Sequence, residues 1–170
     1  YEHSAQKYND LITDSHGNVV INGKILARDE VNLYGDSITV QGENNNKAGI
    51  IAGWKDNNTV FDTQNNAQLV FNNLVSNNIT DTTNFSLENG KIKIVAGFKG
   101  YKDEKKTQPD SDARNATVTV ENANIVGTKE VEIKANSTRD TYIFANADET
   151  ASSTINVTNS NVKSQDINIL

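Results

Sequence analysis

The chain has 170 residues, of which 35% are hydrophobic and 6% aromatic, and it carries a formal net charge of -6. This polar composition argues against a compact globule with a thick core. It favours an elongated repeat fold, whose turns bury their inward side chains against one another. The negative charge argues against nucleic-acid binding, because phosphates are bound by concentrated lysine and arginine side chains. Cysteine is absent, so a disulfide framework and a cysteine-based metal site are excluded.

The beginning of the chain shows no regular apolar spacing, and we expect an irregular N-terminal segment over residues 1–18. It lacks the charged and apolar regions of a signal peptide, while residues 167–170 stop within a strand-like pattern. We therefore expect a single β-helix segment, 1–170, of a larger protein. No apolar run approaches the roughly 18 residues of a membrane-spanning helix, so no membrane span is predicted.

Short apolar triplets with strand character follow, and they start six, six and seven residues apart. They occupy residues 19–21, 25–27, 31–33 and 38–40. Polar corners separate them, in which Gly and Asn adopt turn conformations at little cost. Three such strands per turn give a coil of about 20 residues, the size of a β-solenoid repeat. The sequence therefore predicts solenoid turns over residues 19–98.

Two stretches interrupt this rhythm, at residues 41–62 and 99–114. Loops that leave a rigid scaffold commonly carry binding surface. In the excursion at 41–62 the candidate binding residues are Trp54 and Lys55. For the expected protruding loop 99–114, a functionally silent insertion is the alternative to a binding role. Its candidate binding residues are Lys99, Tyr101, Lys102, Asp103, Lys105, Lys106 and Arg114.

A longer repeat is visible in the C-terminal third, where we expect further solenoid turns over 115–170. Residues 117–125 align with 154–162 at an offset of 37, and 131–133 align with 167–169 at an offset of 36. A weaker copy at 92–96 lies 39 residues before 131–135. Such a spacing fits either two short turns or one turn with a long excursion.

Asparagine recurs at the corners of this repeat, with Asn122 and Asn159 in equivalent positions. Stacked asparagine side chains of successive turns can form hydrogen-bonded ladders, although asparagine also simply marks turns. The sequence thus favours an all-β, parallel β-helix with loop excursions. An antiparallel sandwich is the alternative, because Asn-Gly pairs typical of hairpins occur at 22–23 and 89–90.

Catalysis is not expected, because no nucleophile motif or phosphate-binding loop is present. Parallel β-helices can nevertheless be polysaccharide-cleaving enzymes, which need two carboxyl groups about 5–10 Å apart. Asp29, Glu30 and Asp36 stand at successive corners and could converge, but corners are also where solvated charges are expected.

Metal and cofactor binding are not expected either. His3 and His16 fit surface positions better than a zinc site, since no cysteine can complete the ligand set. Asp103, Glu104 and residues 110–112 supply several oxygens for calcium, but they match no calcium-loop pattern.

The corner and strand residues also follow a family pattern. Four short motifs follow one another along the chain: Gly23-x-Ile25-x-Ala27, Val31-x-Leu33-x-Gly35, Ile38-x-Val40 and Ile50-x-Ala52-Gly53. This progression resembles the filamentous exoproteins of two-partner secretion. The later stretches 90–96 and 113–120 are similar to the filamentous adhesins of the fusobacterial leukotoxin type, and the lack of cysteine agrees with them.

The resemblance implies a right-handed parallel β-helix and export through an outer-membrane transporter partner. It implies a virulence factor that is secreted or displayed on the surface of a Gram-negative bacterium. We therefore expect a non-enzymatic segment that binds a host cell-surface receptor or glycan, without a cofactor. A leukotoxin segment that contributes to killing leukocytes is one alternative, and a β-helix glycan-cleaving enzyme is the other.

Overall fold

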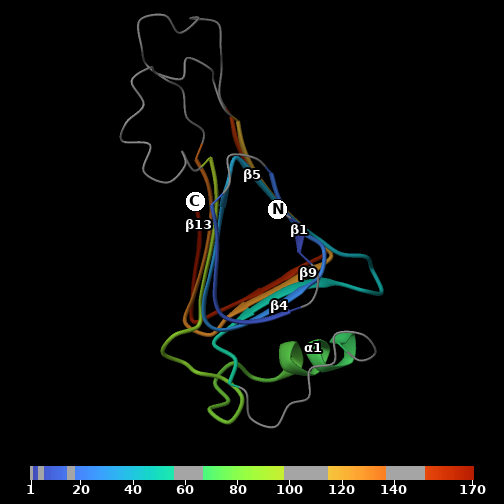
Figure 1. Ribbon diagram of the computed structural model, residues 1–170, viewed down its shortest axis with the longest axis vertical. Coiled ribbons are helices and arrows are strands. Elements are labelled where there is room, and N and C mark those ends of the chain that lie inside the picture. Colours follow the sequence, from blue (N-terminus) through green and yellow to red (C-terminus); the bar gives the residue numbers. More distant parts are fainter. Residues whose placement is uncertain (1, 4–5, 15–17, 56–66, 98–114, 137–151) are drawn as a thin grey trace, which may run out of the picture.

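The computed structural model describes residues 2–3, 6–14, 18–55, 67–97, 115–136 and 152–170. Its strands stack into a prism of triangular cross-section, and one helix lies against one side (Figure 1). Every pair of named strands is parallel. The predicted parallel β-helix is therefore confirmed, and the antiparallel sandwich is excluded for the described part of the chain.

The prism has three faces, which we number in the order in which the chain meets them. Face 1 consists of β1 (Glu2–His3), β3 (Asn18–Ile21), β5 (Ser37–Gln41), β8 (Ala116–Glu121) and β11 (Ser153–Thr158). Face 2 consists of the first parts of β2 (Gln6–Asp14) and β4 (Lys24–Gly35), with β6 (Ala48–Ala52), β9 (Ala123–Gly127) and β12 (Asn161–Lys163). Face 3 consists of the second parts of β2 and β4, with β7 (Lys91–Ala96), β10 (Glu130–Ala135) and β13 (Asp166–Ile169).

One passage over the three faces makes a coil, and the described strands make five. The first coil contains β1 and β2, and the second contains β3 and β4. The third runs through β5, β6 and β7, the fourth through β8, β9 and β10, and the fifth through β11, β12 and β13. Asn18 pairs with Ser37, 19 residues later, so the early coil has the predicted length.

The core is a column of inward side chains that runs through the stacked coils. Alternate residues of a strand point to opposite faces of a sheet, so every second residue enters the column. Ile25, Ile50 and Ile125 occupy successive coils in register and are fully buried. Such parallel stacking buries apolar surface between neighbouring coils, so a modest hydrophobic content suffices.

The C-terminal repeat has the predicted register. Thr117 pairs with Thr154, Val131 with Ile167, and Ile92 with Val131, at the offsets of 37, 36 and 39 seen in the sequence. Each offset spans a single coil, so the repeat is one turn with a long excursion, rather than two short turns.

Two expected boundaries are wrong. Within the expected irregular segment 1–18, residues 2–3 and 6–14 form β1 and β2, which pair in parallel with β3 and β4. The apolar spacing missed them, since β2 contains few apolar residues. Within the expected excursion 41–62, β6 returns to face 2 and pairs with β4 and β9. The loop 42–47 delays this strand and so hides the regular spacing.

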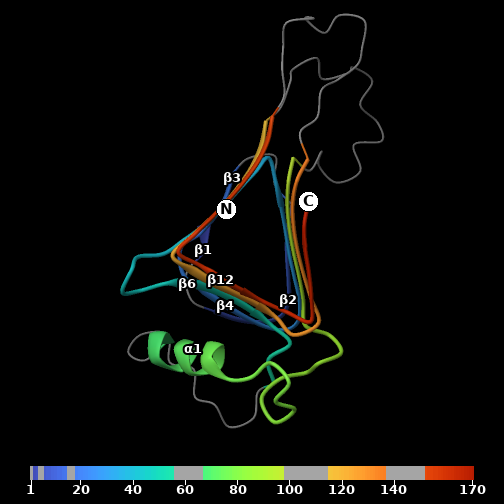
Figure 2. The ribbon, with the colours of Figure 1, turned by 180° about the vertical axis from the view of Figure 1, so that it is seen from behind.

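The helix α1 (Ala67–Ser76) belongs to a long connection between β6 and β7 and covers face 2 (Figure 2). Beneath it, outward side chains of three successive coils, Leu26, Ile51 and Val126, are fully buried. Face 2 is therefore apolar on both sides, as parallel sheets with covered faces commonly are. The sequence analysis did not predict this helix.

The helix is too short to cross a membrane, and no other described helix is long and apolar enough to do so.

Candidate functional site

The predicted binding loop 99–114 lies outside the described residues. This applies to Lys99, Tyr101, Lys102, Asp103, Lys105, Lys106 and Arg114, and to the oxygen cluster considered for calcium. The binding role of this loop stays a prediction. Around it, β7 ends at Ala96 and β8 begins at Ala116, which places its attachment at the corner between faces 3 and 1.

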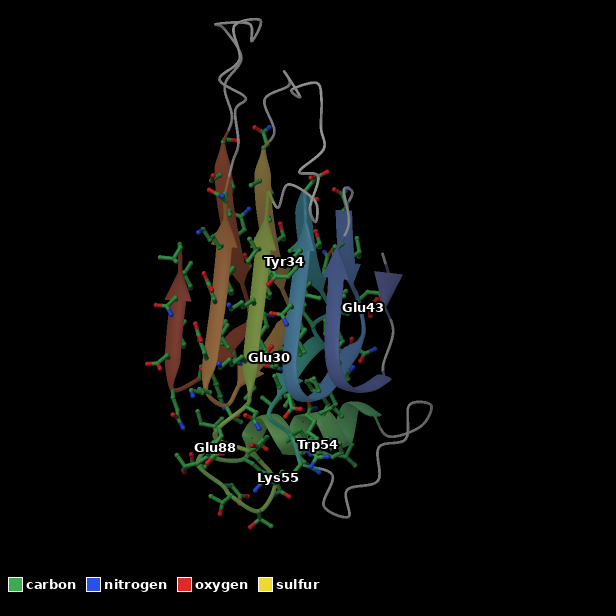
Figure 3. All side chains as sticks on the ribbon, turned by 60° about the vertical axis from the view of Figure 1, so that its left-hand side comes forward. Glu30, Tyr34, Glu43, Trp54, Lys55 and Glu88 are labelled. Carbon is green, nitrogen blue, oxygen red and sulfur yellow. The ribbon has the colours of Figure 1, made fainter. Side chains whose placement is uncertain are left out.

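Trp54 lies inside the molecule, against α1 (Figure 3), with 4% of its surface exposed. It packs with Leu26, Phe71 and Phe85 in the apolar cluster between face 2 and the helix. The exposed aromatic contact expected of Trp54 is therefore absent. Its ring holds the helix-bearing connection to the solenoid.

The half-buried Lys55 ties down the same connection. Its Nζ donates a hydrogen bond to the carbonyl oxygen of Thr82 at 3.0 Å. The backbone N–H of Lys55 donates to Asn84 O at 2.7 Å, so both bonds join the two ends of the excursion. The predicted pair thus has a structural role in the described contacts.

Glu30 and Asp36, two of the three carboxylates considered for catalysis, do not converge. Glu30 begins the part of β4 on face 3, and Asp36 follows its end. Six residues of extended strand separate them, which corresponds to about 20 Å. A glycosidase pair needs about 5–10 Å between its carboxyl groups. Nor do the described His, Asp and Glu side chains form a group of three that could hold a metal ion.

A cleft of about 380 Å³ opens beside α1 on face 2. Small-molecule sites commonly enclose about 300–1,000 Å³, so it has room for a compact ligand. Three parts of the chain form it: the loop 42–47, the C-terminal half of α1, and the outward side of β9 and β12. The residues that line it are Asn44, Asn45, Lys47, Asn72, Val75, Ser76, Asn124, Asn161 and Lys163.

The loop 42–47 forms one wall and projects from the corner between faces 1 and 2 (Figure 1). Backbone hydrogen bonds hold it: Glu43 and Asn46 donate to each other's carbonyl oxygens at 3.0 and 3.2 Å. Where the loop rejoins the solenoid, Ala48 N donates to Asn122 O at 3.0 Å. The wall, which belongs to the third coil, is therefore bound to the fourth coil.

Lys24 fixes the loop from below. Its Nζ donates to Asn46 Oδ1 at 2.9 Å, and its side chain is almost fully buried. Burial lowers the pKa of Lys24 below its ordinary value of 10.5, because a desolvated ammonium is costly. This lysine supports the cleft and does not line it.

The floor of the cleft is a ladder of asparagines on face 2. Asn161 pairs with Asn124 in the parallel register, and its Nδ2 donates to Asn124 Oδ1 at 3.0 Å. At the adjacent corner, Asn159 Nδ2 donates to Asn122 Oδ1 at 2.5 Å and to Asn44 Oδ1 at 3.0 Å. The predicted ladder at Asn122 and Asn159 is confirmed, and it extends into the cleft wall.

The helix forms the opposite wall. Phe71 seats α1 on the solenoid above Gly49, where a Cβ atom would lie 2.1 Å from the ring. At the end of α1, Lys163 Nζ donates to Val75 O at 3.0 Å. Terminal helix carbonyls lack partners within the helix and carry partial negative charge, so this lysine stabilises the helix end.

The lining is rich in amides and lacks carboxylates among its described residues. Each asparagine side chain offers an acceptor oxygen and two N–H donors, so together they can bind hydroxyl groups in either sense. Asn45 and Lys47 make no hydrogen bond within the described structure. The side-chain amide of Asn45 and the ammonium group of Lys47 are therefore available to a ligand.

Sequence reasoning placed Asn44, Asn45 and Asn46 within the excursion 41–62 without giving them a role, and it missed the cleft. Asn124 and Asn161 were aligned by the 37-residue repeat, which was the available signal for the floor. The wall from α1 gave no such signal, because its position depends on packing across face 2.

Comparison with known proteins finds no match for this chain among family descriptions, curated proteins or solved structures.

Proposed function

We propose that the chain is a non-enzymatic, cell-binding segment of a filamentous bacterial exoprotein. The observation that carries this proposal is a polar cleft built on the solenoid, with its two walls and its floor fixed by hydrogen bonds or close packing. Pre-ordered side chains bind with a smaller loss of conformational entropy, which favours recognition by such a site.

The resemblance to two-partner secretion exoproteins supports the rest of the proposal. In this view the segment belongs to a virulence factor that crosses the outer membrane through its transporter partner and is secreted or displayed on a Gram-negative cell. Its partner is a receptor or glycan on the host cell. The separation of Glu30 and Asp36 favours this reading over the glycan-cleaving one.

Flow cytometry with the fluorescently labelled chain tests the proposal on epithelial cells and leukocytes. We expect saturable binding that excess unlabelled chain competes away. A variant with both Asn45→Ala and Lys47→Ala removes an exposed and a half-exposed side chain of the cleft and should reduce binding. The control variant, Thr154→Ala with Thr158→Ala, removes two exposed side chains of face 1 and should bind normally.

Leukocyte viability in the same samples addresses the leukotoxin alternative. Binding without loss of viability agrees with an adhesive segment, whereas killing by the purified chain would favour the toxin. Absence of saturable binding to every cell type would contradict the proposed function.

A further inference from the structure

We infer that the cleft binds an acidic oligosaccharide, with Lys47 contacting the acidic group of the sugar; this inference rests on the proposed function. The two sides of the cleft differ in which groups are already bonded. The loop 42–47 contributes the uncommitted Lys47, whereas beside the C-terminal end of α1 Lys163 already donates to Val75 O. A ligand that fits both sides carries a negative group near the loop and hydroxyl groups near the helix.

The loop side favours an anion. Lys47 is half-exposed and has no hydrogen-bond partner in the described structure, so binding an anion breaks no existing contact. Asn45 stands two residues before it in the same loop and also lines the cleft, where it offers amide N–H donors. Hydrogen bonds between charged groups are stronger than neutral ones, so this contact supplies discrimination as well as affinity.

The helix side favours hydroxyl donors. Helix carbonyls at a C-terminus carry partial negative charge, which disfavours an anion at this wall. One of the three donors of the Lys163 ammonium group is already bonded to Val75 O. Two donors of its ammonium group remain for a neutral oxygen, and Ser76 adds a hydroxyl to the same wall.

The floor is suited to sugar hydroxyls as well. The ladder bond uses one N–H of Asn161 and the oxygen of Asn124, which leaves the amide group of Asn124 and the oxygen of Asn161 with hydrogen-bonding capacity. A sugar hydroxyl both donates and accepts hydrogen bonds, so it can bind the donors and the acceptors that remain along the floor.

Other ligand classes fit less well. The cleft lining contains no aromatic residue, and the rings of Trp54 and Phe71 are buried between face 2 and α1, so the described cleft offers no platform on which a nucleic-acid base could stack. Val75 is the sole apolar residue among the described lining residues, so an apolar peptide would find little to bury.

Titration of the full chain with sialyllactose, sulfated lactose and lactose tests the inference by calorimetry. The three probes share one neutral sugar and differ in a carboxylate, a sulfate or no charge. We expect at least one acidic probe to bind roughly tenfold more tightly than lactose, since one charge-assisted hydrogen bond is worth about that factor. The acidic probe that binds identifies the anionic group, and its affinity should fall as salt is added.

Lys47→Gln should remove the preference and bring the acidic probe to within about threefold of lactose. Lys129→Gln is the matched control, because it removes the same charge at an exposed corner outside the cleft. Circular dichroism of both variants checks that the solenoid is retained.

Equal affinity for all three probes, no measurable binding of any, or an unchanged preference in Lys47→Gln would overturn the inference. The proposed function fails separately, through loss of saturable cell binding. Cell attachment without acidic-sugar preference would leave that function in place and direct attention to another ligand.

Discussion

Asn159 donates from its side-chain amide to the side-chain oxygen of Asn122 at 2.5 Å, across 37 residues of sequence and one coil of the solenoid. Both residues have positive φ angles, 47° for Asn159 and 49° for Asn122, which are uncommon outside glycine. Asparagine tolerates this conformation better than most residues do. The same side chain therefore relieves backbone strain at the corner and connects successive coils.

Replacing Asn122 should separate these two contributions. Asn122→Ala loses the ladder bond, and it places alanine, which is strained at positive φ, at this corner. We therefore expect a loss of about 2 kcal/mol in the free energy of unfolding. Asn122→Gly removes the same side-chain bonds without the conformational strain and should cost about half as much. Urea unfolding measures both. A glycine variant that is less stable than the alanine variant would show that strain is unimportant at this corner.

The coils could be predicted because their signal is local. The triplets at 19–21 and 38–40 fall on the same face one coil apart, and the sequence already shows that spacing. The 37-residue repeat likewise gives the register of β8 with β11 directly. Such matches work because identical positions of successive coils share the same environment. Where an excursion changes the spacing, as between β5 and β6, the local signal is lost.

The site could not be predicted in the same way. Its walls come from residues near positions 45, 75 and 161, and no spacing in the sequence brings them together. Trp54 was expected at the surface because it stands in an irregular stretch, yet its ring is buried between face 2 and α1. Burial by a later helix depends on tertiary packing, which the local pattern does not contain.

The seat of α1 on face 2 can be tested at Gly49. Gly49→Ala would place a Cβ atom 2.1 Å from Cε1 of Phe71, so the Phe71 ring or the helix that carries it must shift. We expect a loss of about 1–3 kcal/mol in stability, as for other overpacked cores, together with weaker binding at the cleft. Urea unfolding and the cell-binding assay provide the two readouts.

A second substitution isolates the cause. In Gly49→Ala with Phe71→Leu, the smaller side chain makes room for the added methyl group, so the two destabilising effects should be less than additive. Additive losses would indicate that the methyl group is accommodated without contact with Phe71, contrary to the proposed seat.

The last coil should be less sensitive to core mutations than the one before it. Ile133 and Ile169 pair in register on β10 and β13, but Ile133 is fully buried and Ile169 is 53% exposed. Ile133→Ala should cost about 2–5 kcal/mol, whereas Ile169→Ala should cost about 1 kcal/mol or less. Thermal unfolding of the two variants measures both losses of stability, and the comparison is direct because both variants replace isoleucine with alanine. Equal losses would mean that β13 is covered in solution by something the isolated fold does not contain.

Lys24 should make stability depend on pH in the alkaline range. Its folded-state pKa lies below 10.5 because burial penalises the ammonium, so between these two pKa values the unfolded chain binds more protons than the folded one. Stability from this group therefore rises with pH through that window and levels off above 10.5. Below the folded-state pKa both states are protonated, and the folded state bears the cost of the desolvated charge.

Lys24→Met removes this titration along with the bond to Asn46. Urea unfolding at several pH values from neutrality to about pH 10 gives the difference in stability between wild type and variant, in which the other titrating groups cancel. We expect wild type to gain stability relative to Lys24→Met as pH rises. Lys129→Met is the control, because Lys129 is exposed at a corner. A difference that stays constant with pH would show that the Lys24 ammonium is as well solvated in the folded chain as in the unfolded one.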